Sequence, residues 1–359
     1  MKIGILTGGG DCPGLNAVIR GVVKTACVKY KWEVIGIESG FEGLILDGHV
    51  RELNPWRIRG ILPAGGTILW SSNKGDPFNY SVEENGSIIK KDLSDKAMEK
   101  FKNIGLDALV VVGGDGTMAI ANKFFKKGMP VVGVPKTIDN DLMATDFTFG
   151  FSTAVETATY ALDKLHTTAA SHKRVIVVEV MGRYVGWIAL CSGIAGGADC
   201  ILVPEIPFDI DKVCKHVMRR AKEGSAFSII VVSEGAKQLG GHVTVKGVDK
   251  KSGVELLGGI GDRVGRMVAE KTGLDVRVTV LGHIQRGGGP ISFDRILSTR
   301  FGVEAVELIK HGRYGHMVCL KGQEISAVTL DDAISKQKSV DPNGSLVRTA
   351  EAIGVCMGR

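Results

Sequence analysis

The sequence is poor in aromatic residues and has no paired-cysteine motif. Phe, Trp and Tyr make up 6% of its 359 residues, and they are not interleaved with basic residues as in a platform that stacks nucleic acid bases. The seven cysteines include no Cys-x-x-Cys pair, so neither a zinc ribbon nor a redox dithiol of that kind is expected. An odd number of cysteines in a long chain favours reduced, mostly buried thiols in a cytoplasmic protein.

Long apolar runs and a strong charge of one sign are absent as well. No apolar run approaches the roughly 20 residues of a membrane span, so no membrane association is expected. Residues 1–6 are predicted to begin a strand rather than to serve as a signal peptide. The 45 basic and 39 acidic residues leave a formal charge of +6 that is spread along the chain. This charge suits small anionic substrates better than nucleic acid.

What the chain does have is an alternation of strand and helix patterns. Its length predicts two domains, and its 44% hydrophobic residues and 49 glycines allow large cores and many tight turns. Apolar runs such as 2–7, 106–112 and 175–180 alternate with helical stretches, which predicts α/β domains with mostly parallel sheets. Residues 79–95 are expected to be irregular, and the chain from residue 292 onward to be mostly helical and surface-forming.

The segment Pro-Lys-Thr-Ile-Asp-Asn-Asp at 135–141 follows an apolar run that predicts a buried strand. Loops at the carboxyl ends of parallel strands carry the chemistry of open α/β sheets. Lys136 can hold a phosphate oxygen and Thr137 can donate to one. Asp139 and Asp141 can take a hydroxyl proton or hold a metal through water. The alternative is a polar turn in which Asp139 caps the next helix.

Two glycine-rich turns add candidate phosphate sites. Gly-Gly-Asp-Gly-Thr at 113–117 lies between a strand pattern and a helix predicted to start near Met118. Glycine lets the backbone approach a phosphate, and a helix N-terminus favours negative charge. Asp115 is placed to meet a magnesium ion carried by a nucleotide. The turn at 8–14 follows the first strand but matches neither a dinucleotide fingerprint nor a P-loop, so a tight turn without a ligand is its alternative.

Basic and acidic residues near later strand ends suggest a second anion site. Arg183 follows the strand pattern 175–180 and can clamp a phosphate with two hydrogen bonds, although a surface ion pair is the alternative. Glu234 could bind sugar hydroxyls or cap a turn. Arg277, His283 and Arg286 are expected to converge on a strand end and a glycine turn, although His283 alone would more often be structural.

In this order, these motifs resemble those of the 6-phosphofructokinase family over essentially the whole chain. The matches are the turn at 8–14, Gly-Gly-Asp-Gly-Thr at 113–117, Pro-x-Thr-Ile-Asp-Asn-Asp at 135–141, Met-Gly-Arg at 181–183 and Leu-Gly-His-Ile-Gln-Arg-Gly-Gly at 281–288. NAD kinases and lipid kinases share only the second. The resemblance implies two Rossmann-like three-layer α/β domains. The donor domain would hold residues 1–150 and 285–335, and the sugar-phosphate domain residues 151–284 and 336–359.

The resemblance also implies an activity, the magnesium-dependent transfer of a phosphoryl group to the 1-hydroxyl of fructose 6-phosphate in glycolysis. Asp139 would be the general base, and Thr137, Arg183 and Lys136 would complete the catalytic set. Donor binding is implied for Gly10, Asn73, Lys74, Gly113, Gly114, Asp115, Gly116 and Thr117, with Asp115 serving the metal. Substrate binding is implied for Thr137, Ile138, Asp139, Arg174, Met181, Gly182, Arg183, Glu234, Arg277, His283, Ile284, Gln285 and Arg286. Arg174 and Arg277 match residues that a neighbouring subunit contributes, so a homo-oligomer, usually a tetramer, is implied.

The phosphoryl donor is where the chain departs from the family pattern. Members that use ATP usually carry glycine at the positions of Gly116 and Lys136, and pyrophosphate users tend to carry aspartate and lysine there. Gly116 leaves room for the α-phosphate of a nucleotide, whereas Lys136 could bind either donor. We therefore expect ATP, with pyrophosphate and a reversible reaction as the alternative. Asn73 and Lys74 stand where bacterial ATP enzymes typically have an arginine, for which Lys74 is a candidate substitute.

Two further alternatives concern the activity itself. A non-catalytic, nucleotide-sensing regulatory subunit would be expected to lose the base or a phosphate clamp, yet Asp115, Asp139, Arg183 and Arg286 are all present. Another sugar phosphate could be the acceptor, because the candidate residues specify a phosphate and hydroxyls without fixing the sugar.

Overall fold

The computed structural model describes residues 1–73, 75–84, 87–248 and 255–359. The chain divides into two compact units. Unit 1 holds Met1–Ser152 and Arg286–Gln337, and unit 2 holds Thr153–Gln285 and Lys338–Arg359. Among the described residues, none of the helices is both long and apolar enough to cross a bilayer.

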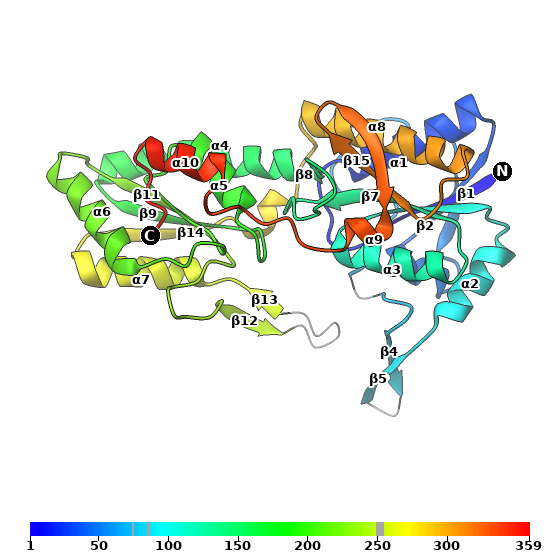
Figure 1. Cartoon of the computed structure of the whole chain (residues 1–359), viewed down its shortest axis with the longest axis horizontal. Helices are drawn as coiled ribbons and strands as arrows, with labels where there is room; N and C mark the ends of the chain where they lie inside the picture. The colour runs from blue at the N-terminus through cyan, green and yellow to red at the C-terminus, as the bar shows by residue number, and fades with distance from the viewer. Residues whose placement is uncertain (74, 85–86, 249–254) are drawn as a thin grey trace. The chain divides into compact units, whose positions relative to one another are not determined.

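Unit 1 is built on an eight-stranded sheet with the order β16-β15-β7-β6-β1-β2-β3, in which β8 pairs with β7 (Figure 1). Its strands are β1 (Lys2–Thr7), β2 (Glu33–Ile37), β3 (Val50–Leu53), β6 (Ala108–Gly113), β7 (Val131–Thr137), β8 (Phe149–Gly150), β15 (His316–Lys321) and β16 (Glu324–Thr329). The strand pairs of this sheet are parallel, except for the antiparallel pairs β2–β3 and β15–β16 at its two edges. Strands β6 and β7 are buried along their whole length, which explains their continuous apolar sequences.

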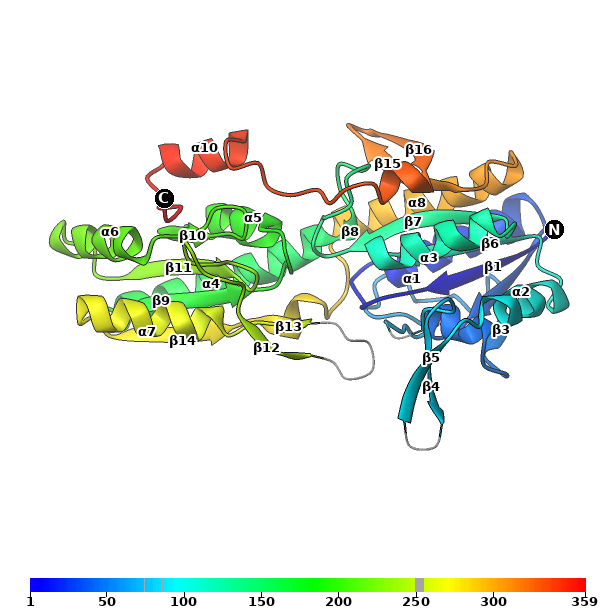
Figure 2. The same cartoon turned by 60° about the horizontal axis from the view of Figure 1, so that its bottom comes forward.

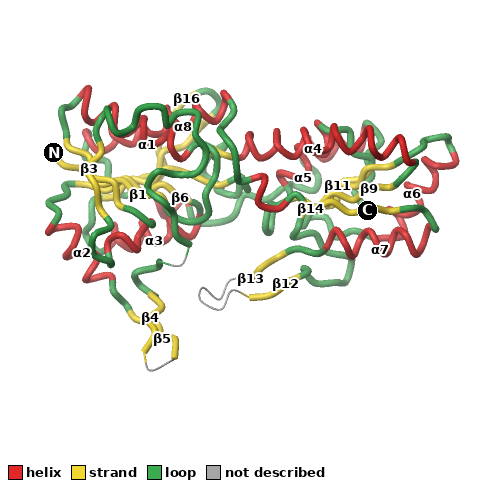
Figure 3. The backbone as a smooth tube through the Cα atoms, turned by 180° about the vertical axis from the view of Figure 1, so that it is seen from behind, coloured by secondary structure: helices red, strands yellow, loops and turns green. Residues whose placement is uncertain are grey.

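Helices cover both faces of the unit 1 sheet. Helices α1 and α8 lie on one face, and α2 and α3 lie on the other (Figures 1 and 3). The bounds are α1 (Leu15–Lys24), a π-helical turn η1 (Thr25–Lys29), a 3-10 turn η2 (Gly40–Leu44), α2 (Ser94–Asn103), α3 (Asp115–Lys126), α8 (Ser292–Lys310) and α9 (Leu330–Ala333). A hairpin of β4 (Tyr80–Glu84) and β5 (Ser87–Lys91) projects from the unit as a separate two-stranded sheet (Figure 2).

Unit 2 has a four-stranded parallel sheet with the order β10-β11-β9-β14. Its elements are α4 (Phe151–His172), β9 (Val175–Val180), α5 (Trp187–Ala195), β10 (Cys200–Leu202), α6 (Ile210–Lys222), β11 (Ser228–Ser233), β12 (Val245–Val248), β13 (Glu255–Leu257), α7 (Ile260–Thr272), β14 (Val276–Val280), a 3-10 turn η3 (Gly282–Gln285) and α10 (Ser345–Ala352). Helices α6 and α7 pack on one face of this sheet, and α4 and α5 on the other (Figure 3).

The predicted α/β class with mostly parallel sheets is confirmed, and four local predictions need correction. The chain after residue 292 is not only helical, because β15 and β16 complete the unit 1 sheet. Residues 79–95 contain the β4–β5 hairpin instead of an irregular loop. Strand β7 continues through Pro135, Lys136 and Thr137, and α3 begins at Asp115, inside the glycine motif.

Helices α1 and α8 cross at unusually close range, because each has a glycine at the crossing. A Cβ atom on Gly302 would lie 2.6 Å from the carbonyl oxygen of Val18, and one on Gly21 would lie 2.9 Å from the carbonyl oxygen of Thr299. Both neighbours are backbone atoms of the partner helix, so a side chain could be accommodated only by moving the helices apart.

We predict that Gly302→Ala lowers the free energy of unfolding by about 1–3 kcal/mol, the usual cost of overpacking. The loss should occur although alanine is the better helix former by roughly 1 kcal/mol. Urea unfolding of the purified chain measures the change. The control is Val303→Ala at the next, exposed position of the same helix, where stability should hardly change. A Gly302→Ala protein as stable as the parent would contradict the close crossing.

Candidate functional site

The glycine turn after β1 is tied to neighbouring loops by its backbone. The amide of Gly8 donates to the carbonyl oxygen of Val112 at 2.8 Å, and that of Gly9 donates to the carbonyl oxygen of Ser72 at 3.0 Å. The hydroxyl of Ser71 returns a hydrogen bond to the carbonyl oxygen of Gly9 at 2.5 Å. The turn therefore has one defined path at the carboxyl end of β1.

Two buried polar side chains hold the loop at 64–72, and neither was singled out from the sequence. Asn16, which is 2% exposed, donates to the carbonyl oxygens of Ala64 and Gly65 and accepts from the amide of Ile68. The hydroxyl of Thr7 donates to the carbonyl oxygen of Trp70 at 2.7 Å. An asparagine within the apolar face of α1 was the available signal. Beyond this loop, Asn73 is exposed and Lys74 lies outside the described residues.

The turn between β6 and α3 is packed around Thr117. A Cβ atom on Gly113 would lie 2.3 Å from the Cβ atom of Thr117, and one on Gly8 would lie 2.8 Å from its Cγ2 atom. Glycine at both positions therefore lets the two turns approach each other through this buried threonine. Gly114 precedes the helix, and Asp115 and Gly116 are exposed in its first turn. A Cβ atom on Gly116 would meet no atom within 4 Å.

Lys136 is a buried cation at the end of β7. Its side chain is part of a residue only 4% exposed, and its Nζ atom donates to the carbonyl oxygen of Gly10 at 2.5 Å. Burial lowers the pKa of Lys136, and the neighbouring Arg286 lowers it further, while Cys12 and Asp139 act in the opposite direction. The ammonium group thus lies beside the glycine turn, within unit 1.

Arg286 approaches the same turn from the start of the second unit 1 segment. Its Nη1 atom donates to the carbonyl oxygen of Asp11 at 3.1 Å, and a Cβ atom on Gly10 would lie 2.7 Å from that nitrogen. The guanidinium group of Arg286 therefore lies where a side chain at Gly10 would be, and the carbonyl oxygen of Gly10 accepts from the ammonium group of Lys136. Two cations at one turn make this end of the sheet attractive to an anion.

The residues after Lys136 form a buried, hydrogen-bonded turn. Thr137, Ile138 and Asp139 are each less than a tenth exposed, and the amide of Asp139 donates to the hydroxyl of Thr137 at 3.0 Å. Asn140 has a φ angle of +52°, and its side chain accepts from the amide of Thr148 at 3.1 Å. The next helix begins only at Phe151, so the alternative in which Asp139 caps a helix is wrong.

In unit 2, three side chains hold the loop at 181–186 by accepting from its amides. Gln285 Oε1 accepts from Met181 at 2.9 Å. Glu234 Oε1 accepts from Arg183 at 3.0 Å, and Glu205 Oε1 accepts from Gly186 at 3.0 Å. The loop that carries the exposed Arg183 is therefore fixed at its start, middle and end, and Gly182 within it has a φ angle of +143° that favours glycine.

Glu205 was not singled out from the sequence, where it stands in an apolar run as a lone acid. Its carboxylate also accepts from the amide of Val340 at 2.8 Å. Burial raises the pKa of Glu205, and the amide donors oppose that rise. Glu205 therefore links the returning C-terminal segment of unit 2 to the Arg183 loop, a contact between residues too distant in sequence to be predicted.

His283 and Ile284 are exposed in the 3-10 turn η3, while Gln285 is fully buried. This turn follows β14, which runs parallel to β9. The carboxyl ends of the two strands lie at the same edge of the sheet, so unit 2 brings the histidine turn to the same edge as Met181, Gly182 and Arg183. Glu234 reaches this edge from the end of β11.

Within unit 2, the predicted convergence of Arg277 with His283 is wrong. Arg277 lies at the start of β14, and Arg174 precedes the start of β9. The two arginines share the carboxylate of Asp275, at 2.5 Å from Arg174 Nε and 2.6 Å from Arg277 Nη1. The six residues of β9, at ~3.3 Å each, put about 20 Å between this pair and the Arg183 edge.

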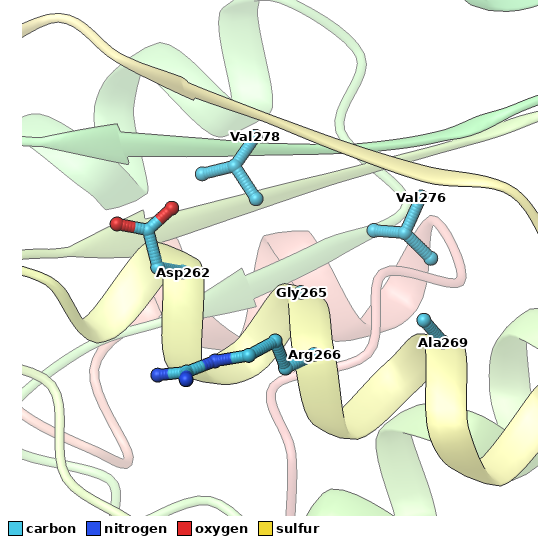
Figure 4. A pocket seen from close by; sticks show the side chains of 6 residues that line it. All are labelled: Asp262, Gly265, Arg266, Ala269, Val276 and Val278. Atoms are coloured by element: carbon cyan, nitrogen blue, oxygen red, sulfur yellow. The ribbon is translucent and has the colours of Figure 1, made fainter.

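Two cavities lie away from the predicted site residues. One of about 480 Å³ lies between α7 and β14 and is lined by Asp262, Gly265, Arg266, Ala269, Val276 and Val278 (Figure 4). The other, of about 330 Å³, lies in unit 1 and is lined by Arg20, Lys24, Val28, Pro55, Ile58, Arg59 and Gly60. Neither lining includes a predicted catalytic, donor or substrate residue among those that the structure describes.

Comparisons with known proteins agree with these features. A family model described as phosphofructokinase matches residues 2–309. ATP-dependent 6-phosphofructokinase 2 of Clostridium perfringens is 56% identical over 99% of this chain and 97% of its own length. ATP-dependent 6-phosphofructokinase of Chloroflexus aggregans is 51% identical over 99% of this chain and 98% of its own length.

Solved structures show the same fold. Pichia pastoris phosphofructokinase in the T-state superposes with a TM-score of 0.79 and 33% identity, covering 93% of this chain and 35% of that one. A pyrophosphate-dependent phosphofructokinase from Nitrosospira multiformis gives a TM-score of 0.82 at 22% identity, covering 99% of this chain and 92% of that one, and supports the fold alone. The glycine turns, the central acid-bearing loop and the arginine loop thus stand on a chain that belongs to the phosphofructokinase family.

Proposed function

We propose that this chain is an ATP-dependent 6-phosphofructokinase, which transfers a phosphoryl group from ATP to the 1-hydroxyl of fructose 6-phosphate in glycolysis. The observation that carries this conclusion is the identity of 46–56% with relatives that are ATP-dependent 6-phosphofructokinases, over 99% of the chain. The expectation of ATP as the donor is thereby confirmed. Fructose 1,6-bisphosphate is the product. As a glycolytic enzyme, the protein is proposed to act in the cytoplasm. This location is consistent with its seven cysteines, all of which are free thiols.

Unit 1 is proposed to bind the donor, within residues 1–150 and 285–335. The proposed donor residues are Gly10, Asn73, Lys74, Gly113, Gly114, Asp115, Gly116 and Thr117. The open space beside Gly116 supports ATP, because an aspartate there would project a negative charge into the region that a nucleotide phosphate needs. Lys136, held against the glycine turn, is proposed to attract a phosphate oxygen without blocking that space.

Asp115 is proposed to hold magnesium. Among the described residues, no group of three or more His, Cys, Asp or Glu could bind a metal ion. Magnesium in kinases is usually held by one or two carboxylates together with substrate phosphates, so a single exposed carboxylate at the start of α3 fits this pattern. When bound with ATP, the ion supplies charge neutralisation at the phosphates.

Asp139 is proposed as the general base that accepts the proton of the 1-hydroxyl as the new oxygen–phosphorus bond forms. The transition state of phosphoryl transfer is loose, so catalysis depends mainly on positioning and charge stabilisation. Thr137, Lys136 and Arg183 are proposed to stabilise the transferring group. The hydrogen bond between the amide of Asp139 and Thr137, and the buried turn around it, support a fixed position for the base.

Unit 2, within residues 151–284 and 336–359, is proposed to bind the sugar phosphate. The proposed binding residues of unit 2 are Arg174, Met181, Gly182, Arg183, Glu234, Arg277, His283, Ile284 and Gln285. Thr137, Ile138, Asp139 and Arg286 of unit 1 are proposed to contribute to the same binding. Arg174 and Arg277 are proposed to serve the site of a neighbouring subunit in a homotetramer. Their position at the amino ends of the strands, about 20 Å from the Arg183 edge of their own sheet, supports this assignment.

The direct test supplies the purified chain with fructose 6-phosphate, magnesium and either ATP or pyrophosphate, and follows fructose 1,6-bisphosphate. We expect turnover with ATP, and a loss of about 10²–10⁴ in kcat for Asp139→Asn with little change in KM. The control Asp95→Asn removes an exposed carboxylate of α2 and should retain full activity. Turnover with pyrophosphate alone would overturn the assignment of ATP as the donor. No turnover with either donor would favour a regulatory subunit or another sugar phosphate as the acceptor.

The role of Gly116 in binding ATP is tested by the substitution Gly116→Asp. We expect kcat/KM for ATP to fall about tenfold or more, as a loss of 1.4 kcal/mol or more would produce, because the carboxylate would lie near the nucleotide phosphates. The melting temperature should be nearly unchanged, since the space beside the residue is open. The matched control is Gly116→Ala, which adds a Cβ without charge and should retain most ATP activity. Unchanged ATP kinetics in Gly116→Asp would contradict the assignment.

Sharing of sites between subunits is tested by mixing two inactive variants, Asp139→Asn and Arg277→Ala. If each site combines Asp139 of one chain with Arg277 of its neighbour, hybrids formed by co-expression contain intact sites. Activity should then recover to about a quarter of the parent value for random pairing. Mixing the proteins without subunit exchange is the control and should give no recovery. A co-expressed mixture that stays inactive would place Arg277 outside a shared site.

A further inference from the structure

The segment after α10 forms a parallel β-bridge with β10 at the edge of the unit 2 sheet. The amide of Cys356 donates to the carbonyl oxygen of Asp199 at 2.9 Å, and the amide of Ile201 donates to the carbonyl oxygen of Cys356 at 3.0 Å. Cys200 and Cys356 face each other in this parallel pairing. Met357 next to them is buried, so the segment is a packed part of the unit.

Directly paired residues of neighbouring strands are within reach of a disulfide. Adjacent strands lie ≈ 4.7–4.9 Å apart, and disulfides join residues whose Cα atoms are usually 4.4–6.8 Å apart. Cys200 and Cys356 are directly paired in this way. Bond formation therefore requires little movement of the backbone.

The two thiols differ in exposure and in acidity. Cys200 is fully buried, whereas Cys356 is partly exposed. The neighbouring thiol of Cys200 lowers the pKa of Cys356 to about 7. The amide of Gly358 and the cations Arg219 and Lys212 of α6 also lower it, while burial of the thiol acts in the opposite direction. A partly exposed, acidic thiol next to a second thiol is the arrangement of a reactive cysteine and its resolving partner.

The other cysteines lack this combination. All seven lie in the described part of the chain, and the pKa of each of the other five is raised by burial. Burial raises the pKa of Cys12 in the glycine turn to about 12 and that of Cys191 to about 11. These thiols are expected to react slowly at neutral pH, because the thiolate is the nucleophile.

We propose that Cys356 and Cys200 form a peroxide-responsive thiol pair, which closes to a disulfide and fastens the C-terminal segment to β10. The Cys356 thiolate attacks hydrogen peroxide, its sulfur is oxidised to a sulfenic acid, and the oxygen–oxygen bond breaks with release of hydroxide. The thiol of Cys200 then attacks that sulfur and expels the oxygen as water. Overall, two thiols and one peroxide give one disulfide and two waters.

The disulfide would act on a segment that also contacts the Arg183 loop. The same return of the chain presents the amide of Val340 to Glu205, whose carboxylate holds the amide of Gly186. Trp187 Nε1 donates to the carbonyl oxygen of Lys338 at 2.9 Å. Oxidation would thus restrict the segment at both ends, between the start of α5 and the edge of β10.

The experiment treats the reduced full chain with hydrogen peroxide and maps its peptides by mass spectrometry. We expect a disulfide-linked peptide pair containing Cys200 and Cys356, loss of two free thiols, and reversal by dithiothreitol. Cys356→Ser should abolish the linkage, and Cys200→Ser should leave a sulfenic acid at Cys356 that dimedone traps. Cys27→Ser, at another partly exposed thiol, is the matched control and should leave the linkage intact.

The result that would overturn the proposal is peroxide oxidation of other cysteines before any Cys200–Cys356 linkage appears in the parent chain. A second measurement is independent of any variant. The rate of Cys356 alkylation by iodoacetamide should rise as pH increases through about 7, because a lowered pKa places the thiolate at lower pH than the usual value of about 8.5. Half-maximal alkylation near the usual value would contradict an activated Cys356.

Discussion

A buried ammonium group has to find a hydrogen-bond acceptor, and in unit 1 the acceptor is the backbone of the glycine turn. Lys136 reaches the carbonyl oxygen of Gly10 from the end of β7, while Arg286 occupies the space that any side chain at position 10 would need. Leaving a buried charge without a partner costs several kcal/mol. The path of the turn, the absence of a side chain at Gly10 and the position of the central loop therefore depend on one another.

The remaining loops at this end of the sheet are also held by close packing and by buried hydrogen bonds. Thr117 fills the gap between Gly8 and Gly113, and Asn16 satisfies three backbone groups of the loop at 64–72. In unit 2, side-chain acceptors hold the loop instead of cations. Gln285, Glu234 and Glu205 accept hydrogen bonds from three amides of the Arg183 loop. In both units, rigid strands carry the loops and buried polar side chains fix their shape.

The apolar runs of the sequence predicted the strands whose faces are both covered. The bounds predicted for β1 and β9 agree with the structure, because each is a short, mostly apolar run that is followed within two residues by a glycine. Strand β7 was predicted too short, since Pro135 and Lys136 are unusual in a central strand. The contacts of Glu205 and Asp275 depend on residues brought together only by folding, so no local pattern predicts them. Asn16 is different, because it stands out as a polar residue within the apolar face of α1.

Strands β15 and β16 and helix α8 have a consequence for the order in which the protein is made. They belong to the sheet and helix layer of unit 1, yet they follow unit 2 in the chain. During synthesis, the ribosome releases all of the first unit 1 segment and most of unit 2 before α8 can cover α1. Until then the surface of α1 that α8 covers and the edge of β7 that β15 pairs with are exposed, and exposed surface of this kind favours aggregation. The nascent chain therefore passes through a stage in which its first domain cannot finish folding, and this is the stage at which a chaperone would be of most use.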